Sequence, residues 1–141
     1  MIELARMQLQ PELPMVRVIT AGMSALFEVT GMEPADSGKL QMAVEEVFVY
    51  CVHSMEDRRF KTPITVRLNY DHGLARVVLE HSGPHGELDR FFKRGATETH
   101  YKCTTPQGLG MRLARAAMDS LTYNYWAPEK MHRFSISYQL R

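Results

Sequence analysis

Hydrophobic and polar positions along the first part of the chain predict one strand and one helix. Residues Ile2–Leu9 alternate imperfectly between apolar and polar types and end before Pro11, as in a strand that stops at a turn. From Val16 onwards, apolar residues recur at helical spacing up to Gly31. This pattern predicts an amphipathic helix with one apolar stripe.

A second helix is predicted after the turn Gly31–Ser37. Its apolar positions run from Leu40 to Val52 and are denser than those of the first helix, which indicates deeper burial. Asp36 or Ser37 is available as its N-cap.

The middle of the chain predicts a β-hairpin. Residues Ile64–Tyr70 and Ala75–His81 alternate in polarity on either side of the turn Asp71-His72-Gly73. Periodicity then fades over residues 82–107, apart from a short turn around Leu88, Phe91 and Phe92. An irregular connection of this length in a small chain is typical of a lid or a binding loop.

The end of the chain predicts one helix and two strands. The helix is expected from about Leu109 to Ser120, and the strands over Leu121–Trp126 and Phe134–Leu140. The whole order, β-α-α-β-β-loop-α-β-β, predicts an α+β fold. We expect a two-layer α/β sandwich in which a mixed, mostly antiparallel sheet is covered on one face by three helices. Residues 1–141 are expected to form a single domain, with the lid-like loop at about 82–107.

Composition narrows the classes of function. Hydrophobic residues make up 45% of the chain, and 17 Lys and Arg against 16 Asp and Glu give a formal net charge of +1. This balance provides no general attraction to nucleic acid or to an anionic membrane. The sequence shows neither an apolar run that predicts a membrane span nor a secretion signal, so a cytoplasmic location is expected. Cys51 and Cys103 are expected to be reduced thiols.

The segment Gly108-Leu109-Gly110 is the strongest indication of function. It closes the long loop and opens a helical pattern, an arrangement that presents backbone N–H groups to a phosphate. The preceding loop contains four basic residues, Arg90, Lys93, Arg94 and Lys102. Together with Glu46 in the second helix, this segment predicts a nucleotide pocket between two helices.

Three blocks of the sequence resemble the GHKL ATPase superfamily in its anti-sigma-factor serine kinase branch. They are the segment around Glu46, the turn Ser82-Gly83-Pro84, and Gly108-Leu109-Gly110 with the helix that ends in Met118-Asp119. The third block, Gly-Leu-Gly-Met-x-Leu-Ala-Arg-x-x-Met-Asp, is the most specific. The resemblance covers nearly the whole chain and implies the Bergerat ATP-binding fold of histidine kinase-like ATPase domains, with ATP and Mg²⁺ as cofactors.

The resemblance also assigns roles to individual residues. Glu46 takes the place of the general base that activates the hydroxyl to be phosphorylated. The Mg²⁺-binding asparagine is replaced by Tyr50, whose neutral phenol is a poor ligand for a hard cation. The adenine-binding aspartate is replaced by His81, two residues before Gly83, and a neutral imidazole has only one acceptor nitrogen. These replacements predict that binding of ATP and Mg²⁺ is weak or lost.

Simpler interpretations of the same residues stay open. Gly-x-Gly before a helix is as often a tight turn as a phosphate site. Glu46 is expected to pair with an arginine or to face water, and Tyr50 to be a core aromatic residue whose hydroxyl has one partner. The basic loop residues are expected to form a solvated surface. No zinc site is predicted, because no pair has structural-zinc spacing among His53, His81, His85, His100 and Cys103.

Three functions follow as hypotheses. The first is an anti-sigma-type regulator that binds a protein partner, a sigma factor or the anti-anti-sigma STAS-type domain, with an impaired nucleotide site. The second is an active Mg-ATP-dependent serine/threonine kinase. The third is a binding domain for a non-adenine phosphorylated ligand. By resemblance the chain is also expected to form a homodimer, without direct contact to nucleic acid or membrane.

Overall fold

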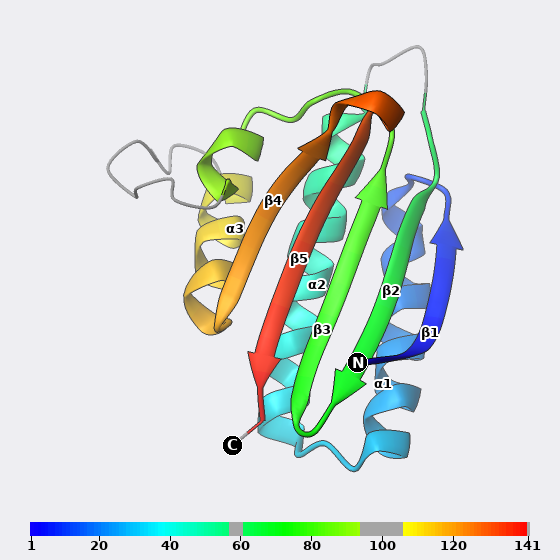
Figure 1. Ribbon diagram of the computed structural model, residues 1–141, viewed down its shortest axis with the longest axis vertical. Coiled ribbons are helices and arrows are strands. Elements are labelled where there is room, and N and C mark those ends of the chain that lie inside the picture. Colours follow the sequence, from blue (N-terminus) through cyan, green and yellow to red (C-terminus); the bar gives the residue numbers. More distant parts are fainter. Residues whose placement is uncertain (57–60, 94–105, 141) are drawn as a thin grey trace.

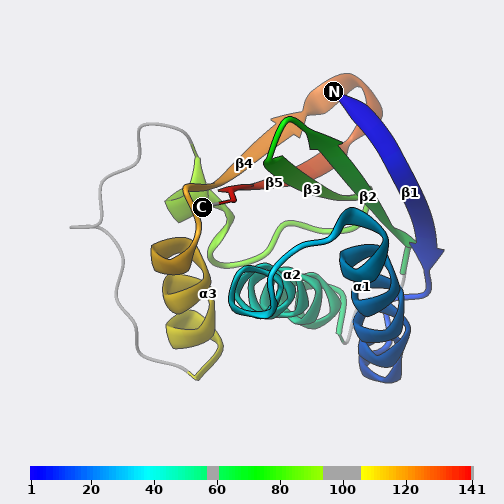
Figure 2. The ribbon, with the colours of Figure 1, turned by 90° about the horizontal axis from the view of Figure 1, so that it is seen from below.

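The elements of the chain form a five-stranded sheet and a layer of helices (Figures 1 and 2). The computed structural model describes residues 1–56, 61–93 and 106–140. The elements are β1 (Ile2–Leu9), α1 (Val16–Thr30), α2 (Pro34–Ser54), β2 (Ile64–Asp71), β3 (Leu74–His81), α3 (Pro106–Ala117), β4 (Ser120–Trp126) and β5 (Met131–Gln139). Short 3₁₀ turns lie at Leu13–Met15, Asp89–Phe92 and Ala127–Glu129.

The strand order is β1-β2-β3-β5-β4, and neighbouring strands pair antiparallel. A parallel contact occurs at the isolated bridge between Lys93 and Tyr123. Figure 2 shows α1, α2 and α3 on the same side of the sheet. The predicted α+β class, with three helices on one face of the sheet, is confirmed.

The predicted hairpin is confirmed as β2 and β3. Its two-residue turn has positive φ at both His72 (44°) and Gly73 (82°). Such mirror-image turns match the right-handed twist of the flanking strands. The register pairs Thr65 with Glu80 and Asp71 with Leu74, so alternate residues of both strands face the helices.

Two helices begin before the positions predicted for them. Helix α2 starts at Pro34 with Glu33 as its N-cap, not at Asp36 or Ser37, and α3 starts at Pro106 rather than at Leu109. Proline is favoured in the first turn of a helix because its missing N–H would have no helical partner there. Helix α3 also ends at Ala117, before the predicted Ser120, which instead begins β4.

Strand β5 begins at Met131, three residues before the predicted start at Phe134. The pairing with β4 extends to Trp126 and Met131, and this carries His132 into the sheet. The inward-facing positions of β5 therefore begin with His132 and continue through Phe134 and Ile136.

Helix α1 is apolar but belongs to the core. By length and composition alone, Leu13–Thr30 could cross a membrane, with a mean hydropathy of 1.3. This differs from the expectation that no such run exists. Ile19, Met23 and Phe27 are buried against the rest of the structure, but only 17% of this window is buried, and a single helix of this kind is weak evidence for a span.

Helix α2 lies between α1 and α3 in the helical layer and carries eight buried residues. The fully buried residues of α2 contact both neighbouring helices and the inner face of the sheet (Figure 2). They are Leu40, Ala43, Val44, Val47, Phe48 and Cys51. Burial raises the pKa of the Cys51 thiol well above its ordinary value, as expected for an unreactive reduced cysteine.

The position of α1 in the core is tested by a pair of adjacent substitutions. Ile19→Ala removes a side chain that is 0% exposed and should lower the free energy of unfolding by about 2–5 kcal/mol. Val18→Ala, at a 41% exposed position, should change it by less than about 0.5 kcal/mol. Chemical denaturation measures both values. Equal effects would contradict this placement of the helix.

Candidate functional site

One face of α2 carries Glu46 and Tyr50, the two residues of this helix that the sequence singled out. Glu46, Tyr50 and Ser54 are spaced four residues apart and therefore share a face of the helix. This face meets the start of α3 at Glu46. Further along, it meets residues 82–93, which follow β3; residues 83–89 of this segment are called the crossing segment below.

Glu46 lies directly against Gly110 of α3. A Cβ atom built at position 110 would overlap the carboxylate of Glu46, so a side chain there would force the Glu46 carboxylate to move away from α3. Burial, and then the negative charge of Glu45, raise the pKa of the Glu46 carboxyl above its ordinary value. Glu45 itself is held by the Thr20 hydroxyl, which donates a hydrogen bond of 2.5 Å to its carboxylate.

The predicted phosphate-binding residues lie inside α3 rather than in a turn before it. Because the helix begins at Pro106, Gly108 is in the first turn and Gly110 follows in the next. Gly108 is buried, whereas the side chain of Leu109 is 49% exposed. The structure thus explains Gly110 by its contact with Glu46.

Tyr50 is buried beneath the crossing segment. Its hydroxyl donates a hydrogen bond of 2.5 Å to Oδ1 of Asp89 and accepts one of 2.9 Å from the N–H of Leu88. The edge of its ring packs against Phe134, with ring centroids 5.6 Å apart. Burial and the neighbouring Asp89 raise the pKa of the phenol far above its ordinary value, so Tyr50 stays neutral and acts as a donor.

Two glycines allow the crossing segment to lie directly on α2. A Cβ at Gly86 would overlap the hydroxyls of Tyr50 and Ser54, and one at Gly83 would be 2.8 Å from the sulfur of Met55. The N–H of Gly86 donates a hydrogen bond of 2.9 Å to Oδ2 of Asp89. The segment is therefore fixed to α2 by contact as well as by hydrogen bonds.

His81 is buried at the end of β3. Its Nδ1 accepts a hydrogen bond of 3.1 Å from the N–H of Gly83, and its ring stacks on His132 with centroids 4.6 Å apart. Burial, followed by the neighbouring His132 and His85, lowers the pKa of His81 to about 3. The imidazole is therefore neutral at physiological pH, and its single acceptor nitrogen is already in use.

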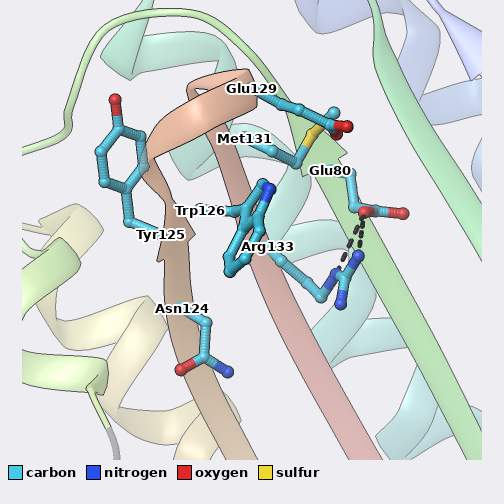
Figure 3. Close-up of a pocket in the computed structure, with 7 residues that line it drawn as sticks. All are labelled: Glu80, Asn124, Tyr125, Trp126, Glu129, Met131 and Arg133. Atoms are coloured by element: carbon cyan, nitrogen blue, oxygen red, sulfur yellow. Dashed lines mark hydrogen bonds and ion pairs between the residues drawn. The ribbon is translucent and has the colours of Figure 1, made fainter.

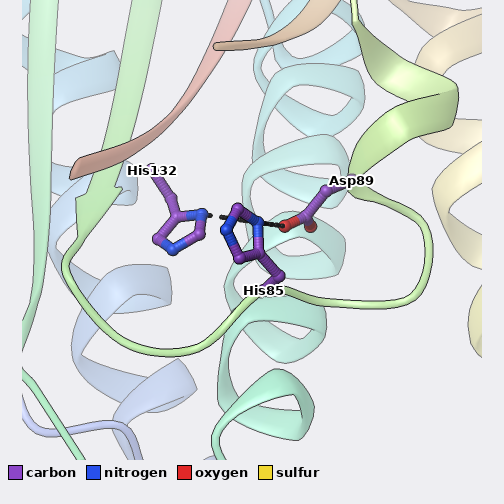
Figure 4. A group of neighbouring side chains, drawn as sticks. All are labelled: His85, Asp89 and His132. Carbon is purple, nitrogen blue, oxygen red and sulfur yellow. Dashed lines mark ion pairs between the residues drawn. The ribbon is translucent and has the colours of Figure 1, made fainter. Parts of the chain in front are cut away.

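A cluster that the sequence did not predict lies beside Tyr50 and His81 (Figure 4). It consists of His85 and Asp89 from the crossing segment and His132 from β5. The alternation of the last strand could have identified His132 as inward-facing, since it is two residues before Phe134. No local pattern marks Asp89, which is 5% exposed because the segment folds back onto α2.

Two cavities lie outside the predicted nucleotide residues. The larger, of about 550 Å³, is on the sheet face opposite the helices and is bordered by Trp126 and the Glu80–Arg133 ion pair (Figure 3). The smaller, of about 220 Å³, adjoins the histidine cluster. Its lining includes Arg90 and Lys93, two of the four predicted basic residues. The other two, Arg94 and Lys102, lie outside the described residues.

Comparison with known proteins agrees with the arrangement of helices and sheet. The family profile of the histidine kinase-like ATPase domain matches residues 9–132. This match spans most of the chain, and the chain therefore belongs to that family, within the GHKL superfamily. A search of curated proteins finds no match.

The role of the Tyr50 hydroxyl is tested by Tyr50→Phe. This change keeps the ring but leaves Asp89 and the Leu88 N–H without this hydrogen-bond partner, so the free energy of unfolding should fall by about 1–3 kcal/mol. Tyr70→Phe is the matched control, because the Tyr70 hydroxyl has no hydrogen bond within the described ranges, and it should change stability by less than about 0.5 kcal/mol. Urea denaturation of the two variants measures both changes. A neutral Tyr50→Phe would contradict the bonded arrangement.

The contact between Glu46 and Gly110 is tested by alanine at two glycines. Gly38→Ala, in α2, adds a Cβ that meets nothing within 4 Å and should raise the free energy of unfolding by about 0.5–1 kcal/mol. Gly110→Ala must displace the Glu46 carboxylate, so the free energy of unfolding of this variant should be at least about 1 kcal/mol lower than that of Gly38→Ala. When Glu46 is also replaced by alanine, the two glycine substitutions should change the free energy of unfolding by the same amount. If Gly110→Ala stabilises the protein as much as Gly38→Ala does, Glu46 and Gly110 are not in contact.

Proposed function

We propose that this chain is an anti-sigma-type regulatory domain that works by binding a protein partner and whose nucleotide site is impaired. The observation that carries the proposal is the hydrogen bond between Tyr50 and Asp89, which holds the crossing segment on the face of α2. In the resemblance described above, that face would meet the triphosphate and its metal. Here the chain itself occupies it.

The residue at the adenine position supports an impaired site. An aspartate would accept a hydrogen bond from the adenine amino group. His81 has one acceptor nitrogen, Nδ1, and the N–H of Gly83 already donates to it. The remaining ring nitrogen of the neutral imidazole carries a proton and repels another donor.

The residues around Tyr50 fit Mg²⁺ poorly. Mg²⁺ requires oxygen ligands in near-octahedral geometry, and an asparagine amide at position 50 would supply one. Tyr50 instead supplies a neutral phenol whose hydroxyl both donates to Asp89 and accepts from Leu88. Loss of a metal ligand affects phosphoryl transfer strongly, because the metal neutralises charge that develops in the transition state.

Exposed apolar side chains support a protein partner. They gather on β1 and on α1 with the turn before it, which lie side by side at one edge of the domain (Figures 1 and 2). The exposed residues there include Ile2, Leu4, Leu13, Val18 and Val29. Exposed apolar side chains that gather at one edge are common at protein interfaces. A sigma factor or a STAS-type anti-anti-sigma domain in the cytoplasm is the partner we propose, and the same edge could also serve a homodimer.

An active kinase is the second candidate, and the position of Glu46 favours it. Its carboxylate lies at the start of α3, and its pKa is raised, as suits a general base. A kinase would bind Mg-ATP and would lose phosphoryl transfer to a STAS-type domain in Glu46→Gln. This substitution keeps the size of the side chain and removes the base.

Titration calorimetry with ATP, with and without Mg²⁺, tests the impaired site. The wild-type chain should bind Mg-ATP no more tightly than about 1 mM. Tyr50→Asn combined with His81→Asp supplies a metal ligand and an adenine acceptor and releases Asp89 from the phenol. This double variant should gain about one to two decades in affinity for Mg-ATP, and the gain should be smaller without Mg²⁺, when only the adenine acceptor contributes.

Tyr50→Phe is the control, since it releases the same segment without adding a ligand and should produce no gain. Micromolar Mg-ATP binding by the wild-type chain, with phosphoryl transfer that Glu46→Gln abolishes, would replace this proposal with the kinase. Larger thermal shifts with GTP or sugar phosphates than with ATP would favour a non-adenine ligand.

Co-elution with a sigma factor or a STAS-type protein tests partner binding. We expect co-elution that does not depend on ATP, and failure to bind either class of protein would refute partner binding.

A further inference from the structure

We propose that His85, Asp89 and His132 form a zinc-binding site between the crossing segment and β5. Figure 4 shows the two imidazoles and the carboxylate pointing toward one another. Their candidate ligand atoms all lie within 4.8 Å of one another. This site shares Asp89 with the impaired nucleotide face proposed above, but it binds a different ligand and lies away from the proposed partner surface on β1 and α1.

The spacing of the three groups is that of ligands around a metal rather than that of hydrogen-bonded partners. Oδ2 of Asp89 is 3.7 Å from Nδ1 of His85 and 3.7 Å from Nδ1 of His132. Both distances are too long for a hydrogen bond. Ligands about 2.0–2.1 Å from a tetrahedral zinc ion are separated by roughly 3.3–3.4 Å, so small movements of the side chains would close the site.

His132 is already oriented as a ligand. Its Nε2 is 2.7 Å from the backbone carbonyl of Gly83, which can only accept, so this nitrogen carries the proton. The other nitrogen, Nδ1, is therefore an acceptor; the Tyr123 hydroxyl now donates to it over 2.7 Å, and a metal would take the place of that bond. A ligating histidine whose second nitrogen donates to a carbonyl is the usual arrangement in protein metal sites.

Asp89 is held in the same way. Oδ1 accepts the hydrogen bond from the Tyr50 hydroxyl, and Oδ2 accepts one from the N–H of Gly86. These two donors fix the direction of the buried carboxylate. Because a carboxylate oxygen has two lone pairs, Oδ2 retains one for a metal.

The fourth position faces the cavity of about 220 Å³. This cavity is lined by His85, Asp89 and Tyr123 and provides both an entry path and room for a water ligand. The Tyr123 hydroxyl, now 2.7 Å from Nδ1 of His132, would exchange that hydrogen bond for one to the metal-bound water. Arg90 and Lys93 at the same cavity would attract an anion in place of water.

The donor set selects the metal. Two imidazoles and one carboxylate with an open position form a common zinc site, whereas Mg²⁺ and Ca²⁺ prefer oxygen ligands. Non-haem Fe(II) also uses this set. Zinc is favoured because three protein ligands and one water molecule complete a tetrahedral site, and no further protein ligand is needed.

Calorimetric titration of the metal-stripped, untagged full chain with ZnCl₂ tests the site. One zinc ion should bind per chain with a dissociation constant on the order of 1 μM or tighter. His85→Ala removes a ligand whose side chain is 61% exposed, so the fold should be kept while affinity falls by at least about tenfold. His72→Ala, 96% exposed in the β2–β3 turn, is the matched control and should bind as the wild type does.

Cobalt(II) provides a second readout that a purely structural role would not produce. The wild-type chain should give the intense visible bands of four-coordinate cobalt, and His85→Ala and His132→Gln should lose them. Circular dichroism of the metal-free variants identifies any that fail to fold, and His85→Ala suffices if His132→Gln does. The proposal is overturned if zinc binding is no tighter than about 1 mM, or if His85→Ala binds zinc as tightly as His72→Ala.

Discussion

The hydrogen bond from the buried Tyr50 phenol to Asp89 is the interaction on which the site depends. It joins the middle of α2 to a segment that follows β3, across 39 positions of sequence. Its acceptor, Asp89, is 5% exposed, and a buried carboxyl group is stable in the interior only when donors satisfy its oxygens. A charge-assisted bond of this kind contributes about 1.5–3 kcal/mol, a large part of the stability of a small domain.

The absence of side chains at three glycines makes this arrangement sterically feasible. Gly83 and Gly86 let the crossing segment contact α2, and Gly110 lets α3 contact Glu46. All three contacts lie along one side of α2. By the resemblance described above, the same side would be the wall of a nucleotide pocket, so in our proposal packing and ligand binding compete for it. That competition is the physical basis of the function we propose.

The proposed zinc site and the proposed loss of nucleotide binding have a common origin. Both follow from the position of Asp89, which faces the Tyr50 phenol with one oxygen and two imidazoles with the other. A metal bound there would further restrain the crossing segment on α2. The surface that we propose for a protein partner, on β1 and α1, lies at the far edge of the sheet from this segment (Figure 2).

The sequence alone determined the element order, the hairpin turn and the fold class, because periodicity and turn chemistry are local properties. It also associated Glu46 with the start of the last helix, through the resemblance to the GHKL superfamily. It misplaced the starts of α2 and α3, since Pro34 and Pro106 were not recognised as first-turn residues. Only the tertiary structure decided which groups surround Tyr50 and His81. Asp89 and His132 reach these side chains through long-range packing and an extended β4–β5 register, and no local pattern encodes such contacts.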